Sequence, residues 1–183
     1  MLDNLRQDLA RLAEIKGRPR WRALVEGLLF ENGFQAVVLH RLAHGFRSRG
    51  IPFFGPFFAR LSLFLTGVDI SPGAVIGPGL YVAHGVGLVV GGWVRIGARG
   101  FLLGGVNLGA PSQGRLAEMP ELGDDVFVGA GARVLGRIRV GSRVVVGANA
   151  VVTRDVPDDC KVVSAAGVEV IPLAARSAPE PRA

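Results

Sequence analysis

An aliphatic residue at every sixth position dominates the second half of this chain and limits the folds it can adopt. The clearest series consists of Leu122, Val128, Val134, Val140, Val146 and Val152. Glycine follows four of these residues. Two positions before each member from Val128 onward stands another apolar or small residue, which is the alternation of a strand with one buried face. Each unit of six is therefore predicted to be one short strand and a turn, in an internal repeat.

The same spacing occurs earlier, where its members are Val90, Ile96, Leu102 and Leu108. The phase of the repeat breaks in two places. Residues 110–121, APSQGRLAEMPE, are polar and rich in turn formers, so we expect a loop that leaves the repeat and returns. A second slip, of two residues, falls between Ile76 and Val90 and brackets His84.

Composition changes near Thr66 and divides the chain into two parts. Eight of the ten phenylalanines precede this residue, whereas 20 of the 27 glycines lie from Gly67 to Gly147. In the first part, helical spacing of apolar residues is interrupted near residues 17–19, 32–33 and 50–52, which predicts two or three helices. We therefore expect a helical segment at 1–66, a repeat domain at 67–173 and a disordered tail at 174–183.

The charge and cysteine content exclude several classes of protein. The net charge is +6, and most of the excess is N-terminal. A basic surface suits nucleic acid or another anionic partner, but no nucleic-acid-binding motif is present, so no nucleic-acid partner is predicted. The single cysteine, Cys160, rules out a disulfide framework and a cysteine-based zinc site, and we expect it to be inert.

Membrane and export signals are weak. The run from Ile51 to Leu65 is the most apolar, but Arg60 and two prolines interrupt it, so neither a spanning helix nor membrane contact is expected. The N-terminal stretch mixes charges with leucines and lacks the unbroken apolar region of a secretion signal. A cytoplasmic location is therefore expected.

Three histidines are candidates for chemistry. His40 and His44 lie four residues apart on one face of a predicted helix, a spacing that can hold a metal ion. One helix face supplies only two ligands, so we expect packing or capping roles and no metal. His84 lies among apolar residues and glycines in LYVAHGVGLVV, where a structural role and a catalytic role are both open.

A six-residue apolar period with these glycines resembles the left-handed parallel β-helix of the hexapeptide-repeat acyltransferases, a mainly β fold. An ordinary antiparallel sandwich would need longer strands and hairpin turns, which are missing. Within that class, GVDISPGAVIGPGLYVAHGVGLVVGG at 67–92 and FENGFQAVVLHRLAHGFRSRGIP at 30–52 resemble serine O-acetyltransferases. The resemblance implies that His84 is the general base and that Asp69, fifteen residues earlier, orients it.

The implied chemistry is acetyl transfer from acetyl-CoA to a hydroxyl group. An imidazole can accept the hydroxyl proton during attack on the thioester, and a carboxylate can fix the imidazole tautomer. Backbone N–H groups near Gly104 and Gly105 are candidate donors to the oxyanion. The resemblance also implies that Ala130 and Ala148 line the coenzyme A groove. Thr153 and Arg154 would reach the pantetheine arm or the phosphates, while aromatic residues such as Trp93 and Phe101 are expected to pack.

Four residues, at three places in the chain, depart from the serine acetyltransferase pattern at the acceptor end. Ala83 replaces the acid that precedes the histidine, Glu118 and Met119 replace the arginine and histidine of an Arg-His-Pro sequence, and Arg18 replaces a third acid. The residues that would hold a zwitterion are thus changed. We therefore expect a hydroxyl-bearing acceptor other than free serine, such as a glycan, a sugar unit or a biosynthetic intermediate.

Two alternatives remain open at this stage. One is a genuine serine acetyltransferase in which other residues hold the acceptor, and the other is a noncatalytic scaffold or regulatory protein that retains the repeat. The resemblance also implies a homotrimer with cofactor grooves between neighbouring coils, or a pair of such trimers.

Overall fold

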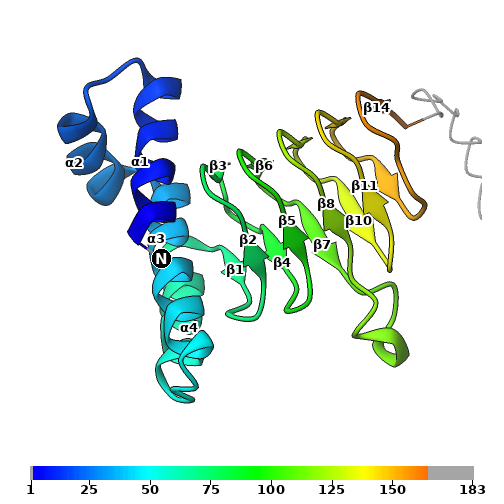
Figure 1. The fold of residues 1–183 in the computed structure, drawn as a ribbon, viewed down its shortest axis with the longest axis horizontal. Helices are drawn as coiled ribbons and strands as arrows, with labels where there is room; N and C mark the ends of the chain where they lie inside the picture. Colours follow the sequence, from blue (N-terminus) through cyan, green and yellow to red (C-terminus); the bar gives the residue numbers. More distant parts are fainter. Residues whose placement is uncertain (1, 165–183) are drawn as a thin grey trace, which may run out of the picture.

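Four helices form one end of the molecule, and three of them pack against a triangular parallel β-helix (Figure 1). The computed structural model describes residues 2–164. The helices are α1 (Leu2–Lys16), α2 (Arg20–Phe30), α3 (Asn32–Ser48) and α4 (Phe54–Thr66). The prediction of two or three helices is wrong, because the apolar run after residue 50 forms a helix of its own. Pro56 lies in the first turn of α4, where the absence of an N–H group removes no helical hydrogen bond.

Successive short strands are assigned in turn to three parallel sheets. The first sheet contains β1 (Asp69–Ile70), β4 (Val89–Val90), β7 (Asn107–Gly109), β10 (Arg133–Leu135) and β13 (Val151–Val152). The second contains β2 (Val75–Ile76), β5 (Arg95–Ile96), β8 (Glu121–Leu122) and β11 (Arg139–Val140). The third contains β3 (Tyr81–Ala83), β6 (Phe101–Leu103), β9 (Phe127–Val128), β12 (Val145–Val146) and β14 (Lys161–Val162).

The aliphatic residues of the six-residue period fill the interior of the β-helix. Strand register places equivalent residues directly above one another, so that Ile70, Val90, Leu108, Val134 and Val152 form one buried stack in the first sheet. Burying each of these side chains contributes about 1.5–3 kcal/mol, before the entropy of ordering the chain is subtracted. The predicted repeat and the mainly β fold are confirmed.

Charged residues of alternating sign form a ladder at the corner between the second and third sheets. Arg99, Asp125, Arg143 and Asp159 occupy equivalent positions in successive coils, and each has a left-handed backbone with φ between 55° and 58°. Arg99 pairs with Asp125, and Arg143 donates two hydrogen bonds to Asp159, at 2.6 and 2.7 Å. The Asp159 carboxylate, as acceptor of these bonds, has its pKa lowered. These ion pairs connect the corners of successive coils. Because they are exposed, each one adds little to the free energy of unfolding.

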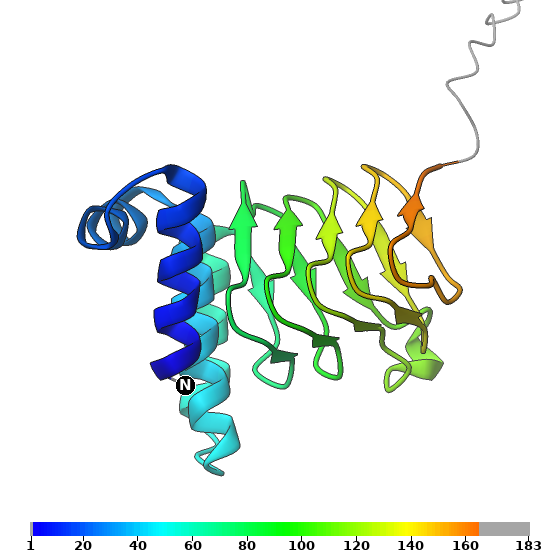
Figure 2. The same cartoon turned by 45° about the horizontal axis from the view of Figure 1, so that its top comes forward.

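The helical segment lies directly on the first coil of the β-helix, at one end of the stack (Figure 2). The closest approach is at Gly33 near the start of α3. A Cβ atom there would lie 1.9 Å from the carbonyl oxygen of Val82 in β3, so only glycine fits. Among residues 2–164, no helix is long and apolar enough to cross a membrane.

Candidate active site

His84 stands at the corner between the third and first sheets, directly after β3. Its side chain is exposed, and its backbone is left-handed, with φ of 51°. The repeat slips by two residues here, so the corner that contains His84 is longer than the others and forms a bulge. The next residue with a left-handed backbone, Gly87, belongs to the regular corner. The coil above packs closely: a Cβ atom on Gly104 would lie 2.2 Å from the carbonyl oxygen of His84. The His84 imidazole is therefore exposed at a corner whose backbone packs closely against the next coil.

Asp69 begins β1, in the coil next to His84. Its backbone N–H donates to the carbonyl of Leu88, at 2.9 Å, which sets the two segments one coil apart. Asp69, however, borders a hollow of about 400 Å³ whose other residues include Arg47, Arg60 and Pro72. No hydrogen bond joins the side chains of Asp69 and His84 within the described part of the chain. The structure thus places the two residues in neighbouring coils without a hydrogen bond between their side chains.

Small residues continue the His84 corner along the β-helix. Gly104, Ala130 and Ala148 follow in successive coils, and both alanines are exposed. The backbone N–H of Asn149 donates to the carbonyl of Ala130, at 2.9 Å, so these turns stack closely, with the Asn149 side chain over Gly131. Gly104, Ala130 and Ala148 therefore leave room along this corner, as a pantetheine arm would need.

Thr153 and Arg154 lie beyond the last strand of the first sheet. Both are exposed and line a hollow of about 640 Å³ that also contains Lys161. Two cationic side chains at this end of the β-helix suit the phosphate groups of coenzyme A. The small residues and these cations together fit the donor that the resemblance implies.

The loop between β7 and β8 folds back onto the corner between the first and second sheets. Met119 packs on Gly91, and its Sδ atom accepts a hydrogen bond from the backbone N–H of Trp93, at 3.3 Å. Glu118 pairs with Arg115 within the loop, at 3.4 Å. Met119 and Trp93 border a hollow of about 480 Å³. Trp93 is 62% exposed, so the expectation that it packs is wrong, whereas Phe101 packs between the rings of Tyr81 and Phe127.

His84 and the loop residues lie at opposite ends of one strand. His84 precedes β4, while Gly91, which contacts Met119, follows it. A single chain therefore does not bring His84 together with Glu118 and Met119. Ala83 is adjacent to His84 but is half-buried and packs toward the apolar cluster beneath the helices.

The two proposed oxyanion donors differ in availability. The Gly105 N–H already donates to the carbonyl of Val86, at 3.0 Å, so this group is not a free donor. The Gly104 N–H has no backbone acceptor within residues 2–164, and Gly104 lies next to the carbonyl oxygen of His84. Gly104 alone therefore remains a candidate donor.

The other two histidines serve the packing of α3. His40 is buried and neither ring nitrogen has a hydrogen-bond partner, whereas Nδ1 of His44 is 3.0 Å from the carbonyl oxygen of Pro72. Burial lowers the pKa of His40 to about 3, and the nearby charge of Arg41 adds to this effect. The part of the chain that the structure describes contains no cluster of three or more His, Cys, Asp or Glu side chains suited to a metal.

The fold is the left-handed β-helix of the hexapeptide-repeat transferases. Residues 119–154 match the family described as bacterial transferase hexapeptide (six repeats). The chain is 43% identical over 149 residues to the serine acetyltransferase of Synechococcus elongatus, covering 81% of this chain and 61% of that protein. It is 42% identical over 148 residues to the serine acetyltransferase of Helicobacter pylori strain J99, covering 81% and 84%.

Solved structures agree with this assignment. Serine acetyltransferase isoform 3 of Entamoeba histolytica, in complex with cysteine, has a TM-score of 0.81 at 31% identity and covers 94% of this chain and 61% of that one. The Neisseria gonorrhoeae enzyme in complex with serine has a TM-score of 0.78 at 34% identity, covering 93% and 68%. The chain belongs to the serine acetyltransferase family. It spans about three fifths of the length of some of these relatives and most of the length of others.

Proposed function

We propose that this protein transfers an acetyl group from acetyl-CoA to the hydroxyl group of an acceptor, with His84 as the general base. The proposal rests on one observation. The imidazole of His84 is exposed, and the following coils carry small residues at the same corner. A hydroxyl is a poor nucleophile at neutral pH, so a base at this position supplies what the reaction needs.

The reaction requires one proton acceptor and one oxyanion donor from this edge. His84 takes the hydroxyl proton as the acceptor oxygen forms a bond to the thioester carbonyl carbon. The Gly104 N–H stabilises the charge on the carbonyl oxygen. When the carbon–sulfur bond breaks, the imidazolium returns its proton to the departing thiolate. The resemblance favours Asp69 as a positioning residue for the imidazolium, a role that requires its side chain to turn from the hollow that it borders toward His84.

Acetyl-CoA binds, in this proposal, along the small-residue edge. Ala130 and Ala148 leave room for the pantetheine arm, and Thr153 donates a hydroxyl hydrogen bond to it. Arg154 holds the phosphate groups, where a guanidinium suits an anion.

The acceptor is proposed to be a hydroxyl compound other than free serine, such as a sugar unit. Ala83 is apolar, Met119 is held against Gly91, and Glu118 pairs with Arg115, so these positions offer no cation to a free carboxylate. Arg18 lies near Glu26 instead of presenting an acid to an ammonium group. Losing such paired contacts costs a few kcal/mol each.

Free serine is the second candidate acceptor. It is favoured by the overall similarity to named serine acetyltransferases and to a family structure in complex with serine. A noncatalytic scaffold is the remaining alternative, and binding of acetyl-CoA separates it from both enzymatic proposals.

The assembly is proposed to be a homotrimer, or two such trimers paired. His84 and Met119 lie at opposite edges of the first sheet. Three copies packed side by side would bring the His84 edge of one chain to the loop edge of its neighbour. In this arrangement, which we propose for the cytoplasm, each acceptor site is shared by two chains.

Thiol release from acetyl-CoA tests the proposal. We expect turnover with a panel of sugars to exceed turnover with L-serine, and His84→Ala to lower the rate by at least 10²-fold. His44→Ala, a histidine change on α3, is the matched control and should retain activity. Full activity in His84→Ala would reject the general-base assignment, and faster turnover with serine than with any sugar would favour the second candidate. A protein that neither binds acetyl-CoA nor releases thiol would support the scaffold.

A further inference from the structure

A hollow of about 480 Å³ lies beside the loop between β7 and β8, and we call it the loop pocket. Met119, at a position where the resemblance implies an acceptor contact, lines this pocket. Trp93 lines it too, and its backbone N–H donates to the Sδ atom of Met119, at 3.3 Å. The loop pocket is therefore the part of the proposed acceptor site that lies at the loop edge of the chain, an assignment that rests on the proposed function.

Trp93 presents a large aromatic surface at the loop pocket. It is exposed, whereas the next residue, Val94, is fully buried in the β-helix. The backbone that carries the indole is thus held by the core and by the contact with Met119. In the proposed trimer the loop edge faces the His84 edge of the neighbouring chain. Trp93 would then lie in the cleft between two chains and not on an outer surface, where it can stack on a ligand.

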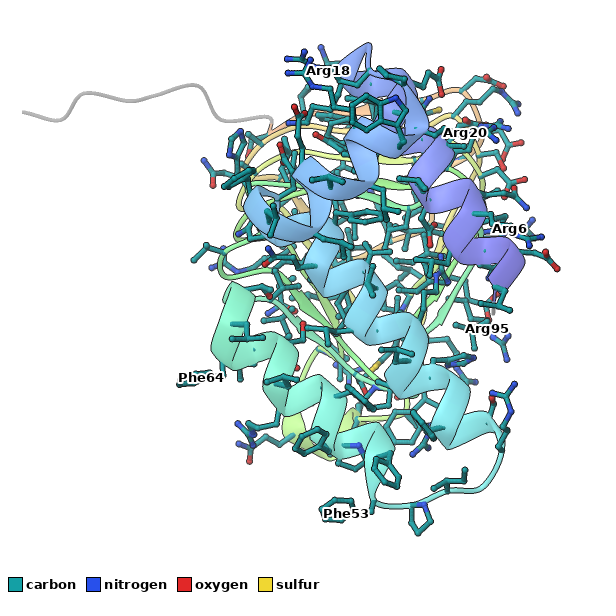
Figure 3. All side chains as sticks on the ribbon, turned by 90° about the vertical axis from the view of Figure 1, so that its left-hand side faces the viewer. Arg6, Arg18, Arg20, Phe53, Phe64 and Arg95 are labelled. Carbon is teal, nitrogen blue, oxygen red and sulfur yellow. The ribbon has the colours of Figure 1, made fainter. Side chains whose placement is uncertain are left out.

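Polar side chains of alternating charge follow Trp93 along the second sheet. Strand register places Arg95 of β5, Glu121 of β8 and Arg139 of β11 side by side, and all three line the loop pocket. The Nε atom of Arg95 is 3.7 Å from a carboxylate oxygen of Glu121, and both side chains are largely exposed. Figure 3 shows the Arg95 side chain extending outward from the side of the molecule. These planar groups offer several hydrogen-bond donors and acceptors beside one aromatic ring.

The mixture of charges in the loop pocket indicates the kind of ligand that it suits. Arg137 and Asp155 also line the pocket, so three guanidinium groups face two carboxylates. The carboxylates oppose a strongly anionic ligand, and the guanidinium groups oppose a cationic one. A neutral ligand rich in hydroxyl groups can use both, because each hydroxyl donates one hydrogen bond and accepts others.

We propose that the acceptor is a pyranose sugar unit whose ring stacks on Trp93 and whose hydroxyl groups bind Arg95 and Glu121. A pyranose with equatorial hydroxyl groups exposes C–H groups on the faces of its ring. These faces are apolar, and their slightly positive hydrogens suit the negative face of an indole. The hydroxyl groups point away from the rim of the ring, toward the polar side chains. Trp93 is thus a specificity-determining residue, and one sugar hydroxyl would reach His84 of the neighbouring chain.

Free serine gains little from the same pocket. It has no ring to cover Trp93, so the aromatic surface contributes no binding energy to this acceptor. The proposal therefore predicts that Trp93 separates the two candidate acceptors of the proposed function, with sugar depending on the indole and serine not.

Fluorescence titration of the full chain tests sugar binding without turnover. The chain has two tryptophans, so the emission of Trp21→Phe comes from Trp93 alone. We expect methyl β-D-glucopyranoside or methyl β-D-galactopyranoside to change this emission saturably, and sorbitol, which has hydroxyl groups but no ring, to leave it unchanged. Trp93→Phe, which keeps only the exposed Trp21 of α2, is the matched control and should show no change with either glycoside.

Steady-state kinetics test the role of the indole in the reaction. We expect Trp93→Ala to raise KM for the sugar acceptor at least tenfold with kcat changed less than threefold, as loss of uniform binding requires. Trp93→Phe should keep KM within about threefold, because a smaller ring still stacks. Arg95→Gln and Glu121→Gln should each raise KM about fivefold. KM for acetyl-CoA should stay unchanged in all four variants, and Trp21→Ala should behave like the wild type.

Mixed trimers test whether the site is shared between chains. Co-expression of His84→Ala with Trp93→Ala should give trimers in which an intact His84 from one chain faces an intact Trp93 from its neighbour. At low sugar concentration these trimers should release thiol faster than either variant alone. A mixture no faster than the separate variants would contradict the shared site.

Three further results would overturn the proposal. The first is an emission of Trp93 that neither glycoside changes. The second is a rise of KM for acetyl-CoA, and not for sugar, in Trp93→Ala, which would assign the loop pocket to the cofactor. The third is a fall in molecular mass of Trp93→Ala by light scattering, which would identify the indole as a contact between copies. If thiol release fails while the glycosides still change the Trp93 emission, the proposed function is wrong and the sugar site stands.

Discussion

Asp8 of α1 and Arg41 of α3 form a buried ion pair that fastens the helices to the β-helix. The Arg41 guanidinium donates to both carboxylate oxygens, at 2.9 and 3.0 Å. One oxygen of Asp8 also accepts the backbone N–H groups of Gly79 and Leu80, and Arg41 donates to the carbonyls of Ile76 and Gly77. The side chain of Asp8 is fully buried and that of Arg41 is almost so. Each charge is therefore compensated, as burial requires.

Removing one member of this pair should leave an uncompensated buried charge. We expect Asp8→Asn to lower the free energy of unfolding by about 3–5 kcal/mol, measured by urea denaturation. Asp3→Asn is the control, because Asp3 forms an exposed pair with Arg6 and should change stability by less than about 1 kcal/mol. Equal effects of the two changes would contradict the role of the buried pair.

Stability should fall in acid because of His40. Burial lowers the pKa of this histidine to about 3 in the folded chain, against about 6.5 in the unfolded chain. Between these values the unfolded chain holds a proton that the folded chain excludes, so the free energy of unfolding decreases as pH falls from 6.5. At pH 5 the His40 contribution should be about 2 kcal/mol lower than at pH 8.

His40→Phe isolates this contribution. Since neither ring nitrogen has a partner, the substitution removes no hydrogen bond. Urea denaturation at pH 5 and pH 8 should show a pH dependence smaller by about 2 kcal/mol than in the wild type. An unchanged pH dependence would show that His40 is not buried in its neutral form.

Gly104→Ala should displace His84 without unfolding the chain. The new Cβ atom would lie 2.2 Å from the carbonyl oxygen of His84, so that backbone must move. We expect kcat for acetyl transfer to fall by about 10²-fold, because small misplacements of a catalytic group are costly. Gly114→Ala, in the loop with open space around it, is the control and should keep full activity. Wild-type activity in Gly104→Ala would argue against this corner as the active site.

Restoring the missing charges should improve the use of serine. We expect the combined change Ala83→Asp, Glu118→Arg and Met119→His to raise kcat/KM for L-serine by about tenfold or more, since charged contacts to a zwitterion are regained. Leu116→Arg adds a cation to the same exposed loop without restoring the pattern and should leave kcat/KM unchanged. Serine turnover that is already high in the wild type and does not rise in the combined variant would favour the second candidate acceptor.

The sequence by itself determined the β-helix, its buried residues and the position of the loop. This was possible because a six-residue repeat is local: the side chain that faces inward in one coil faces inward in the next, as with Val128 and Val146. The resemblance of the segment around His84 identified the candidate base in the same way, from neighbouring residues. The number of helices was harder to read, because the proline-containing run after residue 50 obscured α4.

Only the tertiary structure decided how distant segments meet. Asp8 and Arg41 are 33 residues apart, and their pairing depends on how α1 and α3 dock on the first coil. The exposure of Phe53, Phe64 and Trp93 also depends on that docking and on the loop, since apolar residues carry no local sign of whether a neighbour covers them. The separation of His84 from Met119 across the first sheet likewise follows from the path of the coil.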